Sequence, residues 1–357
     1  MTRLALILCG AILAAALTAA AKTGPSIEAM IGQMVMVGFH GERAGEKWPR
    51  QLRAQIKAGQ VGGVVLYAYN IKDPVQLSDL TRLLHFSADK HILWVAADQE
   101  GGKIQRLTAA KGFSDYPSAK RLAAQKNRTN AFAHYRNLAC ELRGYGINFN
   151  FGPVVDLELN ASSPAIGQLE RSYGPDPKTV AGFAENFIRA HRTCGIMTSL
   201  KHFPGHGSAS GDTHKGLVDV TATANPIELE PFKTLIDKKL ADSVMMAHVI
   251  DRRIDEAPAT FSKKQIDRLR EMGFDGVVIS DDLQMGAIAD YYDFNETVLR
   301  AVEAGNDVLL FSNYFAPDPE IPAKVQAVLK SGIESGRIDR GLIEAAYRRI
   351  VALKNRP

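Results

Sequence analysis

Short apolar runs recur along the whole chain, and the stretches between them place apolar residues at helical spacing. Runs of this length predict buried strands, while apolar positions three and four residues apart predict helices with one face against a core. We expect strands at residues 33–38, 63–67, 92–97, 147–155, 196–200, 243–249, 276–279 and 307–311, and helices at 75–88, 128–143, 177–191, 226–239, 263–272 and 297–304.

Strands that alternate with helices favour an α/β fold in which helices cover a parallel sheet. Strands in this number and order are what a (β/α)8 TIM-type barrel requires, and no linker rich in Pro, Gly or Ser divides the series. We therefore predict a single-domain barrel. A last helix at 339–354, with Asp339 as its N-cap, is expected to pack against the exterior; its apolar positions are Leu342, Ile343, Ala346, Ile350 and Leu353.

The first 21 residues have the pattern of a secretory signal peptide. Arg3 is followed by an apolar stretch and then by small residues at 18–21, where a peptidase would cut. An uncleaved membrane anchor is the alternative, because the apolar run approaches the length of a membrane span. We predict cleavage, a mature domain over residues 22–357 without stable membrane insertion, and a periplasmic or secreted location.

The composition excludes some classes of function. Hydrophobic residues make up 46% of the chain, which predicts a sizeable core, and a net charge of +4 without any basic run gives no reason to expect nucleic acid. No Gly-rich phosphate cradle is present, so no cofactor is expected; the pairs Gly62-Gly63 and Gly101-Gly102 are typical of turns or close packing. Cys140 and Cys194 could form a disulfide or stay as buried thiols, and both readings stay open.

Polar residues fall at the ends of the predicted strands, where the chemistry of a barrel gathers. One pocket could collect them all, although Asp98 could instead cap a turn, Arg106 could lie on the surface and His248 could be a core histidine. The residues are Asp98 and Arg106 after the third strand, Asp156 and Arg171 after the fourth, Lys201 and His202 after the fifth, His248 after the sixth, and Asp281 and Asp282 after the seventh.

The segment 200–217 carries the densest group of ionisable residues. Its glycines and proline predict a loop with tight turns, on which side chains can converge. Asp212 and His214 are two residues apart, so the carboxylate can fix the imidazole tautomer and raise its basicity, as a general acid/base requires. A zinc site is the alternative, because His202, His206, Asp212 and His214 are all possible ligands.

Two motifs carry a resemblance to a known family. The string Lys-His-Phe-Pro-Gly-His-Gly at 201–207, followed by Asp-Thr-His at 212–214, closely resembles the signature of the β-N-acetylhexosaminidase branch of glycoside hydrolase family 3. The stretch Gly-Val-Val-Ile-Ser-Asp-Asp at 276–282 is similar to the family's strand that ends in an acidic nucleophile. The resemblance implies a barrel of the family's N-terminal type over 22–357, without the sandwich domain of the two-domain β-glucosidases, for which we expect this chain to be too short.

The resemblance also implies roles for individual residues. Asp281 is expected to be the nucleophile, and His214 backed by Asp212 the acid/base, where most glycosidases use a second carboxylic acid. Adjacent side chains on an extended segment point to opposite sides, so only one of Asp281 and Asp282 should face the pocket, and reversed roles stay open. Asp98, Arg106, Arg171, Lys201 and His202 are expected to bind the sugar, although extra residues before Arg171 depart from the family pattern.

The resemblance implies a retaining exo-β-N-acetylglucosaminidase that releases terminal β-linked N-acetylglucosamine (GlcNAc), in the family often from peptidoglycan fragments during cell-wall turnover. Three alternatives stay open: a GlcNAc phosphorylase, a β-glucosidase on the same scaffold, and a metal-dependent hydrolase that uses the histidine-rich loop. A sugar-binding barrel without catalysis is disfavoured, because candidates for nucleophile and acid/base are both present. We expect a carbohydrate as the partner, no metal, and a monomer.

Overall fold

The computed structural model describes residues 24–356, and the predicted signal peptide at 1–21 lies outside them. The barrel strands are β1 (Val35–Val37), β2 (Gly63–Leu66), β3 (Trp94–Ala97), β4 (Phe149–Asn150), β5 (Met197–Phe203), β7 (Ser243–Met246), β9 (Val277–Ile279) and β10 (Leu309–Phe311). They pair in parallel in the order β10-β1-β2-β3-β4-β5-β7-β9. A parallel bridge between Ile279 and Val308 joins the two ends of this order, so the sheet closes and the predicted barrel is confirmed.

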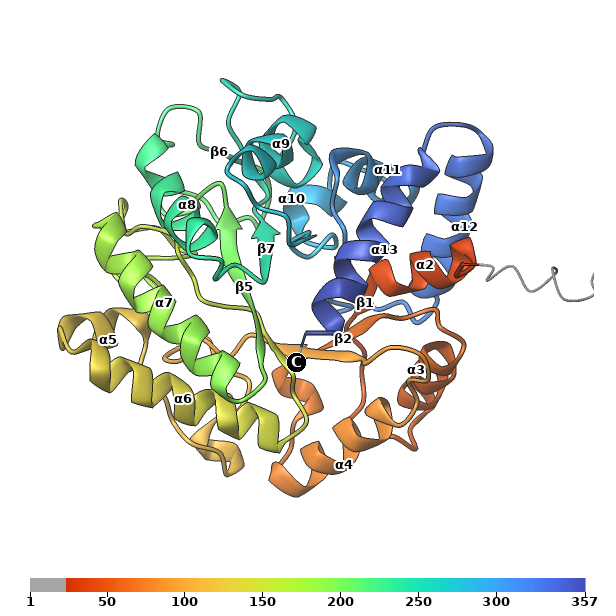
Figure 1. The fold of residues 1–357 in the computed structure, drawn as a ribbon, viewed down its shortest axis with the longest axis horizontal. Coiled ribbons are helices and arrows are strands. Elements are labelled where there is room, and N and C mark those ends of the chain that lie inside the picture. The colour runs from red at the N-terminus through yellow and green to blue at the C-terminus, as the bar shows by residue number, and fades with distance from the viewer. Residues whose placement is uncertain (1–23, 357) are drawn as a thin grey trace, which may run out of the picture.

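Helices surround the barrel (Figure 1). The apolar spacing predicted α4 (Pro74–His85), α6 (Arg128–Gly144), α7 (Pro177–Thr193), α8 (Glu230–Asp237), α9 (Lys263–Glu271) and α11 (Phe294–Ala304). The last helix, α13 (Arg340–Lys354), begins after its predicted N-cap, because the Asp339 carboxylate accepts the backbone N–H of Gly341 at 2.8 Å. The sequence prediction missed α2 (Ile27–Met34), α3 (Lys47–Lys57), α5 (Ala119–Ala124), α10 (Gly286–Ala289) and α12 (Ile321–Glu334).

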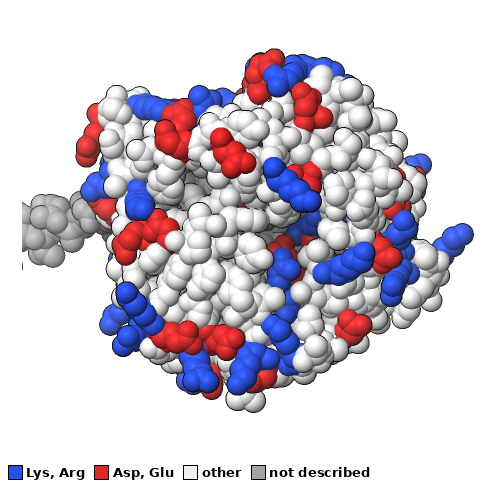
Figure 2. All heavy atoms as spheres, turned by 180° about the vertical axis from the view of Figure 1, so that it is seen from behind, with Lys and Arg blue, Asp and Glu red and all other residues white. Residues whose placement is uncertain are grey.

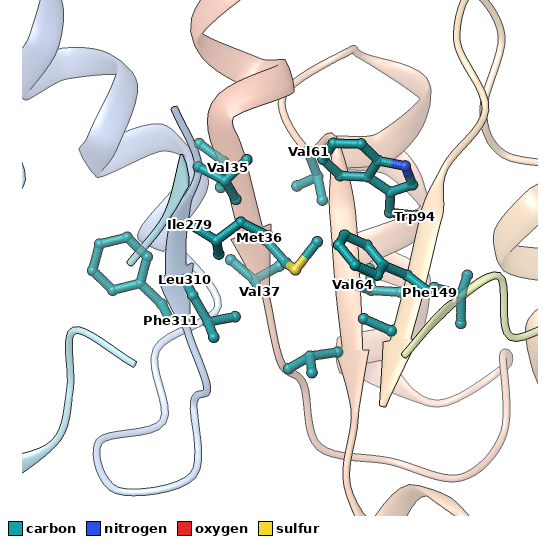
Figure 3. Close-up of a cluster of buried hydrophobic side chains, with 14 of the residues drawn as sticks. Val35, Met36, Val37, Val61, Val64, Trp94, Phe149, Ile279, Leu310 and Phe311 are labelled. Carbon is teal, nitrogen blue, oxygen red and sulfur yellow. The ribbon is translucent and has the colours of Figure 1, made fainter. Parts of the chain in front are cut away.

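The strands bury a dense apolar core. Figure 3 shows side chains from β1, β2, β3, β4, β9 and β10 gathered in one cluster, with Met36 among them. Gly63 leaves the space that Met36 fills, since a Cβ at this position would lie 2.5 Å from Met36 Cε. The neighbouring Gly62 would place a Cβ 2.4 Å from the carbonyl oxygen of Gln33. The glycine pair therefore serves close packing, one of the two roles expected for it.

The N-terminal ends of the strands are covered by the end of α13, which also packs against α2. Lys354, the last residue of α13, is buried and donates to the carbonyl oxygen of Gly62 at 2.7 Å and to Gln33 Oε1 at 2.8 Å. Its ammonium lies 4.7 Å from the centre of the Trp94 ring, and burial lowers its pKa to about 7. The last helix thus reaches beneath the barrel as well as packing beside it.

Two strands differ from their predicted lengths. β5 continues through Lys201 and His202, which the sequence placed in a loop, because the chain stays paired there: Val154 bridges Lys201 in parallel. β4 keeps only the start of its predicted range, since Pro153 follows it and has no N–H for a ladder. The predicted strand at 243–249 is divided, and β8 (Val249–Ile250) pairs instead with β6 (Val218–Asp219) in a separate small sheet.

Cys140, in α6, and Cys194, directly after α7, form a disulfide with their Cα atoms 5.2 Å apart. This settles the pairing that the sequence left open. Within residues 24–356, no helix is both long enough and apolar enough to span a lipid bilayer.

Candidate active site

A cavity of about 730 Å³ lies at the C-terminal ends of the barrel strands. A second cavity, of about 720 Å³, lies around Lys354 at the opposite end and is lined by none of the predicted site residues. The first is lined by all of them: Asp98, Arg106, Arg171, Lys201, His202, Asp212, His214 and Asp281.

A chain of ion pairs forms one wall of this cavity, with Lys201 and Glu100 buried and their partners partly exposed. Lys201 Nζ lies 2.8 Å from Asp98 Oδ1 and 2.7 Å from Glu100 Oε1. Arg106 donates to Asp98 Oδ2 at 3.0 Å, and Arg171 donates to both oxygens of Glu100 at 2.7 and 2.9 Å. Each cation faces a carboxylate, so the wall presents charged donors and acceptors in fixed positions.

The ion pairs also set the protonation of the wall. Burial would raise the pKa of Asp98, but the charges of Lys201 and Arg106 outweigh it and hold that pKa well below its usual value. Burial is likewise outweighed at Glu100, where Arg171 and Lys201 hold the pKa at about 2. The sequence reasoning assigned no role to Glu100. Its signal was its place two residues after Asp98, which on an extended segment gives the two side chains the same face.

His202 is oriented by a carboxylate behind it. Its Nδ1 lies 2.7 Å from Asp156 Oδ2, and its backbone N–H reaches the same oxygen at 3.2 Å. Asp156 is buried, which would raise its pKa, but His202 and His206 hold that pKa below its usual value. The ionised Asp156 therefore fixes the proton on Nδ1 of His202, and Nε2 lies toward the cavity, 3.4 Å from Arg171 Nη2.

Asp281 and Asp282 both contribute atoms to the lining of the cavity, but the Asp282 side chain is buried and its Oδ2 atom is shielded from solvent. The chain bends at Asp281 instead of continuing as a strand, and the alternation of side chains ends there. Asp282 Oδ1 accepts the backbone N–H groups of Ser312 at 2.9 Å and Gln284 at 3.1 Å. Burial nevertheless raises the pKa of Asp282 to about 6, so this residue serves mainly to hold the loops after β9 and β10.

Asp281 makes fewer hydrogen bonds than Asp282. One of its oxygens accepts the backbone N–H of Asp282 at 2.8 Å, and the other makes no hydrogen bond within residues 24–356. Burial would raise the pKa of Asp281, but the imidazoles of His248 and His202 and the bond from Asp282 hold it below its usual value. An ionised carboxylate with a free oxygen in a cavity has the properties of a nucleophile.

His248 lies beneath the two aspartates and is fully buried. Its Nε2 is 2.9 Å from the carbonyl oxygen of Asp282, and its Nδ1 is 2.8 Å from Thr260 Oγ1. Burial lowers its pKa, which favours a neutral ring. His248 does not line the cavity, and it bears on the site through the loop that it holds.

Asp212 and His214 occupy an exposed loop at the edge of the cavity. His214 Nδ1 lies 2.7 Å from Asp212 Oδ1, and 53% of the His214 side chain is exposed. Burial would raise the pKa of Asp212, but the bonds from His214 outweigh it and lower that pKa. The loop packs against α10. The Ala287 N–H donates to the carbonyl oxygen of Thr213 at 3.2 Å. A Cβ added at Gly286 would lie 3.0 Å from the carbonyl oxygen of His214.

The mouth of the cavity carries aromatic side chains that the sequence reasoning missed: Tyr67, Tyr69, Tyr314 and Phe315. They follow β2 and β10, and their only signal in the sequence was this position at strand ends.

The ligands proposed for a zinc site form two pairs: the His202 and His206 rings lie 5.9 Å apart, and His214 contacts Asp212 at 2.7 Å. His206 is buried, with Nε2 3.5 Å from Thr213 Oγ1, and it does not line the cavity. Within residues 24–356, no group of three or more His, Cys, Asp or Glu side chains is arranged to hold a metal ion. The zinc alternative therefore has no geometric support in this part of the chain.

Comparison with known proteins identifies the family. The model of the glycosyl hydrolase family 3 N-terminal domain matches residues 26–353. This chain belongs to glycoside hydrolase family 3. It is 35% identical over 301 residues to a β-hexosaminidase of Nitrosomonas eutropha, covering 80% of this chain and 83% of the relative. It is 34% identical over 329 residues to a β-hexosaminidase of Xanthomonas euvesicatoria, covering 87% and 92%.

Solved structures give the same family. A family 3 β-N-acetylglucosaminidase from Paenibacillus superposes with a TM-score of 0.84 at 34% identity, over 93% of this chain but only 62% of the other. This chain therefore spans less than two thirds of that protein. A β-N-acetylhexosaminidase from Beutenbergia cavernae also has a TM-score of 0.84, at 30% identity over 93% of this chain and 99% of the other. The family 3 protein described here is a glycoside hydrolase.

Proposed function

We propose that this family 3 protein is a retaining exo-β-N-acetylglucosaminidase that removes terminal β-linked GlcNAc. One observation carries the proposal: an ionised carboxylate, Asp281, and a histidine oriented by a carboxylate, His214, line one cavity from separate loops. Retention needs a nucleophile and a proton donor at the same glycosidic bond. The names of the relatives, which are β-hexosaminidases and β-N-acetylglucosaminidases, support GlcNAc as the sugar.

The terminal sugar binds against the wall of ion pairs. Asp98 offers carboxylate oxygens to sugar hydroxyls, while Arg106 and Lys201 offer charged donors; Arg171 and His202 extend this set. Side chains fill the barrel interior, so a sugar chain enters the cavity with its end foremost. This geometry favours removal of the terminal unit.

In the first displacement, a carboxylate oxygen of Asp281 attacks the anomeric carbon and forms a glycosyl-enzyme ester. The bond to the leaving oxygen breaks, its electron pair stays on that oxygen, and the oxygen takes the proton from His214 Nε2. Asp212 accepts the Nδ1–H of the same ring and so keeps that proton on Nδ1. General acid catalysis of this kind contributes about 10²- to 10⁴-fold to the rate.

In the second displacement, water gives a proton to His214 Nε2 while its oxygen attacks the anomeric carbon. The bond to Asp281 breaks, the carboxylate is restored, and GlcNAc leaves with its β configuration retained. The imidazole is protonated again, so both groups are ready for the next substrate. After the first step the histidine is neutral, so phosphate could replace water, and phosphorolysis is a second reaction to test.

The location is proposed to be the periplasm or the outside of the cell. The signal-like residues 1–21 and the disulfide between Cys140 and Cys194 both support an oxidising compartment. Peptidoglycan fragments and chitin fragments would both offer terminal GlcNAc there.

The test measures release of p-nitrophenol from the β-N-acetylglucosaminide and from the β-glucoside by the protein without residues 1–21. We expect turnover of the first substrate that survives EDTA, a loss of at least about 10⁴-fold in Asp281→Asn, and a much smaller loss in Asp282→Asn. A preference for the glucoside, or equal activity in wild type and Asp281→Asn, would contradict the proposal. Formation of GlcNAc 1-phosphate on addition of phosphate would replace hydrolysis with phosphorolysis.

A further inference from the structure

The aromatic side chains at the mouth of the cavity form a continuous surface. The rings of Tyr69 and Tyr314 lie 5.9 Å apart at 24°, and those of Tyr314 and Phe315 lie 5.1 Å apart at 76°. Tyr314 and Phe315 are 54% and 47% exposed. We call Tyr69, Tyr314 and Phe315 the aromatic platform. Exposed apolar surface that continues into a cavity is typical of a ligand-binding groove.

The platform is built into the site by hydrogen bonds. Gln284, on the loop that follows Asp281, accepts the backbone N–H of Asn313 at 2.6 Å and donates to the carbonyl oxygen of Ala316 at 2.6 Å. Asn313 in turn donates to the carbonyl oxygen of Gly38 at 2.8 Å. These bonds bracket Tyr314 and Phe315, so the platform keeps a fixed position relative to the nucleophile loop.

Further rings stack on Tyr69. His40 stacks on Tyr69 at 4.6 Å and 11°, and Trp48 stacks on His40 at 5.4 Å and 25°. This stack holds the Tyr69 ring in one orientation, which lowers the conformational entropy that ligand binding would cost.

The chemistry of the reaction places the next sugar on this surface. The leaving oxygen must take its proton from His214, and this oxygen belongs to the second sugar of the substrate. The Phe315 ring lies 6.1 Å from the His214 ring. A sugar bonded through that oxygen, with its partner against Asp98 and Lys201, therefore lies beside Phe315 and Tyr314.

The charges of the cavity favour an uncharged second sugar. The lysine and arginine side chains in its lining are Arg106, Arg171 and Lys201, and each is paired with Asp98 or Glu100. The described lining therefore holds no unpaired lysine or arginine that could receive the carboxylate of an acidic sugar. The platform itself offers flat apolar faces, on which the C–H faces of a neutral sugar ring can stack.

We propose that the aromatic platform is an acceptor subsite that binds the second, uncharged sugar of the substrate by stacking. The preferred substrates are then neutral β-linked GlcNAc oligosaccharides. This inference rests on the proposed function and narrows it.

The test compares N,N′-diacetylchitobiose with methyl β-N-acetylglucosaminide, which has the same terminal sugar and no second ring. We expect Tyr314→Ala and Phe315→Ala each to lower kcat/KM on the disaccharide about tenfold, the scale of a lost aromatic contact, and to change it less than about twofold on the methyl glycoside. Tyr291→Ala is the matched control, because Tyr291 is 56% exposed and does not line the cavity. It should leave both values unchanged.

Unchanged turnover of the disaccharide, or equal losses on both substrates, would overturn the subsite. A disaccharide of GlcNAc linked to muramic acid carries a free carboxylate and tests the charge argument. We expect wild-type kcat/KM on it to be lower than on the chitobiose, and a higher value would overturn the preference for a neutral sugar. If wild type cleaves none of these compounds, the proposed function fails, which is distinct from failure of the subsite alone.

Discussion

The two sides of the cavity are built differently. On one side, Lys201, Asp98 and Glu100 lie on or just after barrel strands and form a network in which Lys201 and Glu100 are buried. On the other side, Asp212 and His214 bond mainly to each other on an exposed loop that rests on α10. The ion pairs of the first side help to stabilise the barrel, whereas the exposed loop of the second side contributes little to its stability. Changes on the first side should therefore cost stability as well as activity, and changes on the second should cost activity alone.

His214→Ala is expected to show the largest difference between loss of activity and loss of stability. Loss of the general acid should lower kcat/KM about 10²- to 10⁴-fold on a p-nitrophenyl glycoside. The loss should be much smaller on a 2,4-dinitrophenyl glycoside, because that leaving group needs little protonation. Urea denaturation should show a change in unfolding free energy within about 0.5 kcal/mol, as for other exposed side chains. A similar loss of kcat/KM on both glycosides would contradict the role of His214 as general acid. A large loss of stability would contradict the difference between the two sides of the cavity.

Glu100→Gln, on the other side of the cavity, is expected to cost stability as well as activity. This change leaves Arg171 and Lys201 buried with one carboxylate fewer, and breaking a buried pair costs about 3–5 kcal/mol of unfolding free energy. The contribution of Glu100 is complete above the ordinary carboxyl pKa and is lost as the pH falls toward about 2. Arg189→Gln, in an exposed pair with Glu185 at 2.8 Å, is the control and should change stability by less than about 1 kcal/mol. A loss of unfolding free energy in Glu100→Gln no larger than that in Arg189→Gln would contradict a stabilising role for the ion pairs of the cavity wall.

A smaller effect, visible only through pH, is expected from Asp282→Asn. The pKa of Asp282 is raised from 3.8 to about 6, so the ionised carboxyl destabilises the fold as the pH rises through that range. The shift corresponds to about 3 kcal/mol. The difference in unfolding free energy between variant and wild type should therefore move in favour of the variant by about this amount from pH 4 to pH 7. A difference independent of pH would mean that Asp282 ionises normally, and would reopen its claim to be the nucleophile.

Most of the barrel could be predicted from the sequence because each strand and helix is encoded locally by its apolar spacing. The strand-end positions of Asp98, Lys201 and Asp281 followed from that order. β5 was predicted too short, since its extension through Lys201 depends on pairing with Val154 rather than on local composition. Contacts between residues far apart in the sequence were not predicted, for the same reason.

The candidate site shows this limit clearly. Arg171 and Glu100 are 71 residues apart and meet only when the barrel closes. Tyr69, from the loop after β2, and Tyr314, from the loop after β10, become neighbours by the pairing of β1 with both strands. Asp282 and Ser312, which bond across the loops after β9 and β10, are likewise 30 residues apart. Motifs within one segment were readable from the sequence, and contacts between segments were not.

The most direct test of the central claim is to trap the covalent intermediate. A 5-fluoro derivative of a GlcNAc glycoside with a good leaving group should form the ester and hydrolyse it slowly, and peptide mass spectrometry would then locate the sugar. We predict one added fluorosugar per chain, attached to Asp281, present in Asp282→Asn and absent in Asp281→Asn. Attachment to Asp282, or rapid turnover without any labelled carboxylate, would contradict a mechanism in which Asp281 is the nucleophile.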